Sequence, residues 1–263
     1  MARRDSLKNV MRLIEAAKIE QPIEDSFLHD LEYTIEKESA KSARKPSQTY
    51  KPSSMNCIRN MYYQVTGAEQ DVGEVSYNLV GITQSGSDVH EHIQTYVTKM
   101  KEYGIDCEYV NVAEFVKSRG LDCLTIVAQQ GMETKLYHKT LNMSFLCDGI
   151  IKYLGRYYIL ELKTETSYKS QMRKGVDPKH YNQGIAYSIA FGINDVLFVY
   201  INRDVFTMKS FMFNVTDDMK QQLVGTIEEC DSYVKRLKVP PKPENLEKRT
   251  CDYCAYKTLC GKD

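Results

Sequence analysis

The sequence predicts an α/β protein with a mixed central β-sheet flanked by helices. In residues 131–164, β-branched and aromatic side chains alternate with polar ones, which is typical of consecutive strands. Segments with apolar residues at helical spacing precede and follow this stretch, and two further apolar segments lie between the later helices. The order of helix, strands, helix, strands and helix favours an α/β fold with both helical and sheet layers. At 263 residues the chain is long enough to enclose a substantial core.

The helices of the first half are predicted from apolar spacing and from residues that favour a helix start. We expect helices over residues 6–18, 23–38, 55–65 and 87–103. Pro22 precedes the second, and Pro52, Ser53 and Ser54 provide a start for the third. The polar residues 39–47 indicate a connecting loop.

The remaining elements alternate between strand and helix patterns. We expect strands at 133–139, 143–153, 156–164, 196–201 and 207–213, and helices at 178–191 and 216–237. Gly155 fits the turn between two of these strands, and Pro178 fits the first turn of its helix. The proline-rich residues 239–243 predict a stiff spacer before the C-terminal segment.

The charge balance narrows the class of protein. Lys plus Arg and Asp plus Glu both number 35, which excludes a histone-like polycation and an acidic disordered chain but leaves a local basic groove possible. No apolar run has the length of a membrane span, and the N-terminal residues form a charged amphipathic pattern instead of a signal peptide. We therefore expect a soluble, cytoplasmic protein without a membrane partner.

Two acidic residues and a lysine form the most informative pattern. Glu161 and Lys163 lie two apart on a predicted strand, so they face the same side, while Leu162 points into the core. A hairpin through Gly155 brings Asp148 beside them. Two converging carboxylates repel each other unless a cation lies between them, and oxygen ligands suit Mg²⁺ or Mn²⁺. A surface salt bridge would explain Glu-x-Lys alone, but not three charged groups beside an apolar strand.

These residues resemble the core motif of the PD-(D/E)XK nuclease superfamily: Asp148, followed on the next strand by Glu161-Leu162-Lys163. Two further segments are similar to the RecB-like branch. The run Gly86 to His90 resembles its Gly-x-x-x-His segment, and Gln183 with Tyr187 resembles its Gln-x-x-x-Tyr helix motif. The resemblance implies a restriction-endonuclease-like core and a metal-dependent nuclease.

The resemblance also implies a role for each motif residue. The implied ligands of Mg²⁺ or Mn²⁺ are His90, Asp148, Glu161 and the carbonyl of Leu162. Lys163 would orient the attacking water, and Gln183 and Tyr187 would position the nucleic acid and the lysine. Glu133 matches a further acidic position more weakly. The family often has a glycine just before the aspartate, where this chain has Phe145-Leu146-Cys147, so the local bend departs from the pattern.

Three cysteines crowd the C-terminus. Cys251, Cys254 and Cys260 have Cys-x₂-Cys-x₅-Cys spacing and need a fourth ligand to complete a site. Cys57 matches the lone N-terminal cysteine of iron–sulfur RecB-like nucleases, a group that includes AddB and CRISPR-associated RecB-like exonucleases. The resemblance therefore implies a 4Fe-4S cluster on these four cysteines. The spacing alone leaves zinc open as the metal and Cys230 open as the fourth ligand.

A basic and aromatic segment follows the lysine-bearing strand. The basic residues, which we expect near the substrate phosphates, are Lys169, Arg173, Lys174, Lys179 and His180. The aromatic residues that could stack on unpaired bases are Tyr157, Tyr158, Tyr168 and Tyr181. A solvated surface loop is the alternative interpretation of this segment.

The resemblance implies a single-stranded DNA exonuclease that acts in recombination, repair or replication, as a stand-alone bacterial or phage protein. Residues 1–50 would form a helical extension, and residues 51–263 a nuclease domain whose segment 251–260 binds the cluster. The expected partners are DNA with a free end and a separate helicase or recombination protein, because the chain has no phosphate-binding loop motif. The alternatives are a catalytically silent DNA-end-binding scaffold and an endonuclease or RNA-processing nuclease.

Overall fold

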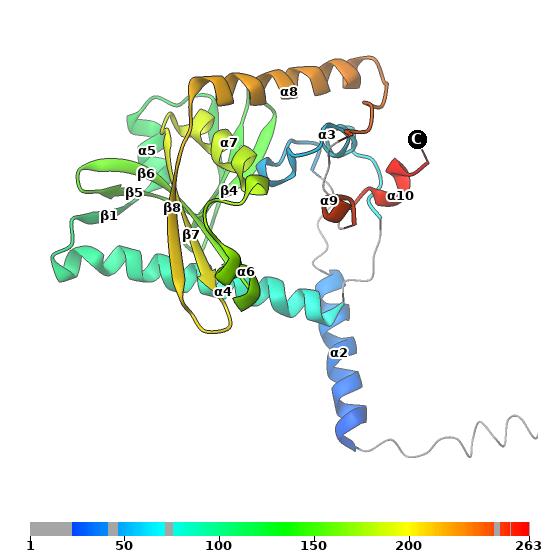
Figure 1. Ribbon diagram of the computed structural model, residues 1–263, viewed down its shortest axis with the longest axis horizontal. Coiled ribbons are helices and arrows are strands. Elements are labelled where there is room, and N and C mark those ends of the chain that lie inside the picture. Colours follow the sequence, from blue (N-terminus) through cyan, green and yellow to red (C-terminus); the bar gives the residue numbers. More distant parts are fainter. Residues whose placement is uncertain (1–22, 42–46, 72–75, 245–247, 253, 263) are drawn as a thin grey trace, which may run out of the picture. The chain divides into compact units, whose positions relative to one another are not determined.

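The computed structural model describes residues 23–41, 47–71, 76–244, 248–252 and 254–262 (Figure 1). The chain forms two compact units, one of residues 1–44 and 73–83 and the other of residues 45–72 and 84–263. The helix expected over residues 6–18 lies outside the described residues. None of the described helices is long and apolar enough to cross a membrane.

The first unit is helical where it is described. Helix α2 (Ile23–Lys41) extends three residues beyond its predicted end, and helix α4 (Tyr77–Lys99) begins in this unit and continues into the second. The backbone N–H of Tyr77 donates to Oε1 of Glu36, at 3.1 Å, which joins the start of α4 to α2.

The second unit contains a five-stranded mixed sheet in the order β1-β5-β6-β7-β8. Its strands are β1 (Cys107–Val110), β5 (Gly149–Tyr153), β6 (Arg156–Glu165), β7 (Asp195–Asn202) and β8 (Met208–Asn214). Strands β6 and β7 are parallel, and the other pairs are antiparallel. With helices on its faces, this sheet confirms the predicted α/β class and is consistent with a restriction-endonuclease-like core.

A second sheet corrects one strand prediction. Strands β2 (Leu124–Gln130), β3 (Glu133–His138) and β4 (Met143–Cys147) form a separate antiparallel sheet. The single strand expected over 143–153 is wrong, because the chain leaves β4 at Asp148 and enters β5 of the other sheet. The apolar alternation continues across this break, so the sequence pattern does not reveal it.

Helices cover both faces of the five-stranded sheet (Figure 1). Of the described helices, the sequence predicts α2, α3 (Ile58–Val65), α4, α7 (Tyr181–Phe191) and α8 (Asp217–Lys235). The remaining described helical elements are short: η1 (Pro52–Ser54), η2 (Met100–Tyr103), α5 (Val112–Ser118), α6 (Ser167–Met172), η3 (Pro178–His180), α9 (Lys248–Asp252) and α10 (Lys257–Cys260). Three predicted starts are wrong: α3 begins three residues late, after η1, α7 begins three residues late, after η3, and α4 begins ten residues early.

The core has two apolar layers, separated by the five-stranded sheet. Strand β6 alternates between them: Leu160 and Leu162 pack with Ile93 of α4, and Ile159 packs into the layer that contains α7 and α8. Because side chains alternate along a strand, Glu161 and Lys163 share the α7-facing side with Ile159. The fold thereby places two charged groups against the helix that bears Gln183.

The N-terminus of α8 offers a test of one local contact. The hydroxyl of Thr216 accepts from the backbone N–H of Met219 at 3.3 Å, and Thr216 is exposed. Because an N-cap oxygen satisfies a helix donor, Thr216→Ala is expected to lower the free energy of unfolding by about 1 kcal/mol in urea titrations. Thr216→Ser is the matched control and keeps the stability. Equal stability of the alanine variant and the wild type would contradict the cap.

Candidate functional site

Two buried carboxylates meet where β5 begins beside β6. Gly149 pairs with Leu160 across the ladder, which sets Asp148 opposite Glu161 on one side of the sheet. Asp148 is 6% exposed and Glu161 is 2% exposed. Oδ2 of Asp148 accepts from the backbone N–H of Leu162 at 2.6 Å. Asp148 and Glu161 therefore lie on neighbouring strand positions and on the same side of the sheet.

Lys163 and Gln183 enclose the carboxylate of Glu161. Oε1 of Glu161 lies 2.6 Å from Nζ of Lys163 and accepts from Nε2 of Gln183, also at 2.6 Å. Nζ of Lys163 donates to Oε1 of Gln183 at 2.9 Å. Gln183 and Tyr187 are joined at 2.9 Å, and the Tyr187 hydroxyl donates to the carbonyl of Leu146 at 2.8 Å. The structure thus brings the lysine, the glutamate and the α7 pair into one hydrogen-bonded chain.

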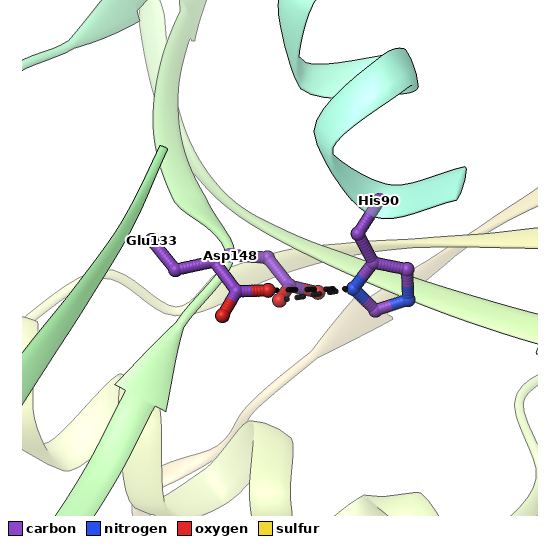
Figure 2. A group of neighbouring side chains, drawn as sticks. All are labelled: His90, Glu133 and Asp148. Carbon is purple, nitrogen blue, oxygen red and sulfur yellow. Dashed lines mark ion pairs between the residues drawn. The ribbon is translucent and has the colours of Figure 1, made fainter. Parts of the chain in front are cut away.

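His90 approaches the site from α4. Its Nδ1 lies 3.4 Å from Oδ1 of Asp148 and 3.6 Å from Oε1 of Glu133, as Figure 2 shows. Burial disfavours the charged imidazole, but hydrogen bonds to Asp148 and Glu133 outweigh it and raise the pKa of His90 to about 9. His90, Glu133 and Asp148 each offer one ligand atom, and among the described residues these three atoms lie within 4.8 Å of one another.

This donor set fits a divalent cation. Oε2 of Glu161 is buried and has no hydrogen-bond partner, and burial raises the pKa of Glu161 to about 7 despite the adjacent Lys163 ammonium. A raised pKa in a buried acid means that its negative charge is incompletely compensated by the protein. Carboxylate oxygens with one imidazole are suitable ligands for Mg²⁺ or Mn²⁺. Glu133, the weaker match in the sequence, lies 3.6 Å from His90, and Asp148 lies 3.4 Å from it.

Two residues that the sequence analysis does not single out contact the same segment. Gln94 and Tyr109 both donate to the backbone carbonyl of Asp148. Gln94 follows His90 by four residues, so it shares its helix face, and this spacing is the one sequence signal that points to it. Tyr109 lies on β1, a short strand that the sequence does not predict.

The four cysteines of the proposed cluster line one cavity of about 280 Å³. Cys57 precedes α3, whereas Cys251, Cys254 and Cys260 come from the C-terminal segment, and all four are free thiols. Cys230 does not line this cavity; it is buried on α8, near the carbonyl of Ile58. Arg59, Lys242 and Lys257 also line the cavity, so it carries positive charges beside the cysteine sulfurs.

The basic segment after β6 is largely neutralised. Arg173 lies 2.9 Å from Glu165 and 3.3 Å from Asp177, and Lys179 lies 3.5 Å from Asp177. These charges are therefore engaged with buried or partly buried acids, a pairing that the sequence does not reveal. Of the aromatic residues expected beside them, Tyr168 is 75% exposed, whereas Tyr157 packs against Phe115.

Comparisons with known proteins place the chain near a few solved structures. No family model matches the sequence, and no curated protein matches it. The crystal structure of SSO0001 is 18% identical, covers 92% of this chain and 98% of its own, and gives a TM-score of 0.48. An alkaline exonuclease, LHK-Exo, from Laribacter hongkongensis is 12% identical, covers 73% of this chain and 92% of its own, and gives a TM-score of 0.44. The crystal structure of LHK-Exo in complex with dAMP is 12% identical, covers 72% of this chain and 91% of its own, and gives a TM-score of 0.43.

His180 provides a prediction about acid stability. Its Nδ1 lies 2.9 Å from the hydroxyl of Tyr200. Burial, with the nearby Lys163 and Lys179 charges, lowers the pKa of His180 to about 3. An unfolded histidine has a pKa of about 6.5, so between these values the unfolded state binds a proton that the folded state does not. The stabilising contribution is complete above pH 6.5 and is lost as the pH falls toward 3.

The variant His180→Asn is therefore expected to flatten the fall of unfolding free energy below pH 6.5, by at most about 1.4 kcal/mol per pH unit. Urea titrations at several pH values from 7 to 4 measure this slope. The matched control is His29→Asn, which removes an exposed histidine on α2. Parallel pH profiles of the His180 variant and the wild type would contradict the buried neutral imidazole.

Proposed function

We propose that this protein is a divalent-metal-dependent nuclease that hydrolyses DNA phosphodiester bonds. The observation that carries this proposal is the group formed by His90, Glu133 and buried Asp148. The ion pair of Glu161 with Lys163 lies beside it, on the strand opposite Asp148. The acids give the site a net negative charge that a bound cation would offset. The positive lysine beside them suits the negative charge of a phosphate substrate. The motif resemblance to RecB-like nucleases supports the same conclusion.

Each residue has a role in this proposal. His90, Asp148, Glu161 and the Leu162 carbonyl, joined by Glu133, would hold Mg²⁺ or Mn²⁺. When bound, the cation supplies positive charge that stabilises the scissile phosphate and the leaving oxygen. Lys163 orients the attacking water and offsets phosphate charge. Its pKa is raised by the adjacent Glu161 carboxylate, against the opposing effect of burial, so its ammonium stays charged at neutral pH. Gln183 fixes Lys163 relative to Glu161, and Tyr187 anchors Gln183 to the backbone.

The substrate we favour is single-stranded DNA with a free end, cut as an exonuclease in recombination, repair or replication. Exposed Tyr168 on α6, just after the lysine-bearing strand, supports it, because an aromatic ring can stack on an unpaired base. The proposed organisation keeps residues 1–50 as a helical extension of the nuclease domain, with a helicase or recombination protein as a separate partner. A cytoplasmic setting belongs to the same proposal.

Replacing Lys163 tests the chemistry. Lys163→Met keeps the length and the apolar part of the side chain but removes the ammonium. We expect cleavage of end-labelled single-stranded DNA with Mn²⁺ to fall by about 10²–10³-fold, since one charge-stabilising donor is lost. The matched control is Lys235→Met, which removes an exposed lysine of α8 and keeps wild-type cleavage.

Undiminished cleavage by Lys163→Met would refute the proposed role of the lysine. Chelation provides the complementary measurement: EDTA is expected to abolish cleavage, and added Mn²⁺ to restore it. A protein that binds DNA equally well with EDTA and yields no products under any metal condition would be a silent end-binding scaffold instead. Competition between DNA and RNA oligonucleotides separates the RNA-processing alternative.

We also propose a 4Fe-4S cluster on Cys57, Cys251, Cys254 and Cys260. All four cysteines line one cavity of about 280 Å³, which supports a metal group held jointly by their sulfurs. The motif resemblance to iron–sulfur RecB-like nucleases favours the cluster over zinc.

Anaerobic purification tests the cluster. The wild-type protein is expected to be brown and to contain about four iron atoms and four sulfides per chain. Cys260→Ser should lose most of the iron and the visible absorption. Cys123→Ser is the matched control, since Cys123 is a free thiol outside the cavity. A colourless protein with one zinc per chain would overturn the iron–sulfur assignment.

A further inference from the structure

Two side chains, from α4 and from β1, donate hydrogen bonds to the backbone carbonyl of Asp148. Nε2 of Gln94 donates to it at 2.6 Å, and the hydroxyl of Tyr109 donates to it at 2.5 Å. Gln94 is 1% exposed, and Tyr109 is partly buried. Two side-chain donors on one carbonyl fix its direction, at the residue where the chain passes from one sheet to the other.

Tyr109 also reaches the neighbouring sheet. Its hydroxyl lies 3.0 Å from the carbonyl of Met132, the residue before Glu133. One phenol oxygen therefore stands between the backbone segments that carry Glu133 and Asp148. The β3–β4 ladder ends at the pair Thr134–Cys147, so Glu133 and Asp148 are the next opposing residues, just beyond its last paired position.

Gly149 is the residue that allows this contact. A Cβ built on Gly149 would lie 2.7 Å from both Cε2 and the hydroxyl oxygen of Tyr109. Such a distance is shorter than van der Waals contact permits, so any larger residue would displace the ring. Glycine is required here for steric reasons. It follows the aspartate, whereas the family pattern often has a glycine just before it.

Gln94 couples the same carbonyl to the histidine. It lies four residues after His90 on α4, so both side chains leave the helix on one face. His90 meets the carboxylate of Asp148 while Gln94 meets its carbonyl. Rotation or translation of α4 would therefore strain both contacts together.

We propose that Tyr109 and Gln94 are positioning residues that set the divalent-cation site, by fixing the Asp148 backbone relative to Glu133 and His90. This inference rests on the proposed metal-dependent function. Partners that orient ligands typically change metal affinity by about 10–100-fold when they are removed. Tyr109 and Gln94 act through Asp148 and Glu133 and need no contact with the substrate.

Direct measurement of Mn²⁺ binding to the full-length protein, by electron paramagnetic resonance of the free ion, tests the proposal. Tyr109→Phe removes the hydroxyl and keeps the ring, and Gln94→Leu removes the donor at similar size. Both are expected to weaken the Kd for Mn²⁺ by about 10–100-fold. Tyr103→Phe, at an exposed tyrosine, is the matched control with unchanged Kd. A Kd within twofold of the wild type for both variants would overturn the proposal, whatever their melting temperatures.

A double-mutant cycle tests the steric part. Gly149→Ala alone is expected to weaken Mn²⁺ binding, because it displaces Tyr109. In a Tyr109→Ala background the same substitution should have little further effect, since the ring is absent. Additive effects would refute the coupling. Wild-type protein that binds no Mn²⁺, or binds it as well as Asp148→Asn does, would instead remove the proposed metal-dependent function itself.

Discussion

The burial of two acidic side chains against each other is the constraint on which the rest of the site depends. Asp148 and Glu161 are both buried, and carboxylates in such a place are unfavourable unless neighbouring groups offset their charge. The protein provides one backbone N–H, one lysine, one glutamine and one histidine for them, and still leaves an oxygen of Glu161 without a partner. The arrangement is incomplete as a purely structural one, and a bound cation would complete it.

The break between β4 and β5 makes this convergence possible. Asp148 follows the last pair of the β3–β4 ladder, Thr134 with Cys147, so it lies opposite Glu133 at the end of that sheet. Because the chain then enters β5, the same residue also lies opposite Glu161 of the five-stranded sheet, and α4 adds His90 from a third direction. The site is thus assembled at a junction of two sheets and a helix, where rigid elements hold its ligands.

The parts of the site that could be predicted from sequence are pairs of residues whose spacing matches the repeat of a strand or of a helix. Glu161 and Lys163 share a strand face because they are two apart, and Gln183 and Tyr187 share a helix face because they are four apart. The contacts of Tyr109 with Asp148 and Met132 join residues 39 and 23 positions apart, and no local period encodes them. The ion pair of Arg173 with Glu165 has no such local spacing either, because Glu165 becomes a partner only once β6 and the segment after it are folded.

At the cysteine cavity, packing and hydrogen bonds already join the two distant segments that carry the cysteines. Tyr256 is 2% exposed, and its ring lies 5.5 Å from that of Tyr63 on α3. The backbone N–H of Asp71 donates to the carbonyl of Ala255 at 2.6 Å, and its carboxylate accepts from the backbone N–H of Thr258 at 2.8 Å. These interactions close the long loop between Cys57 and the C-terminal cysteines through ordinary burial and hydrogen bonding. A cluster in the cavity would then add to a segment that already has its own anchor, unlike the small zinc domains whose folding depends wholly on the metal.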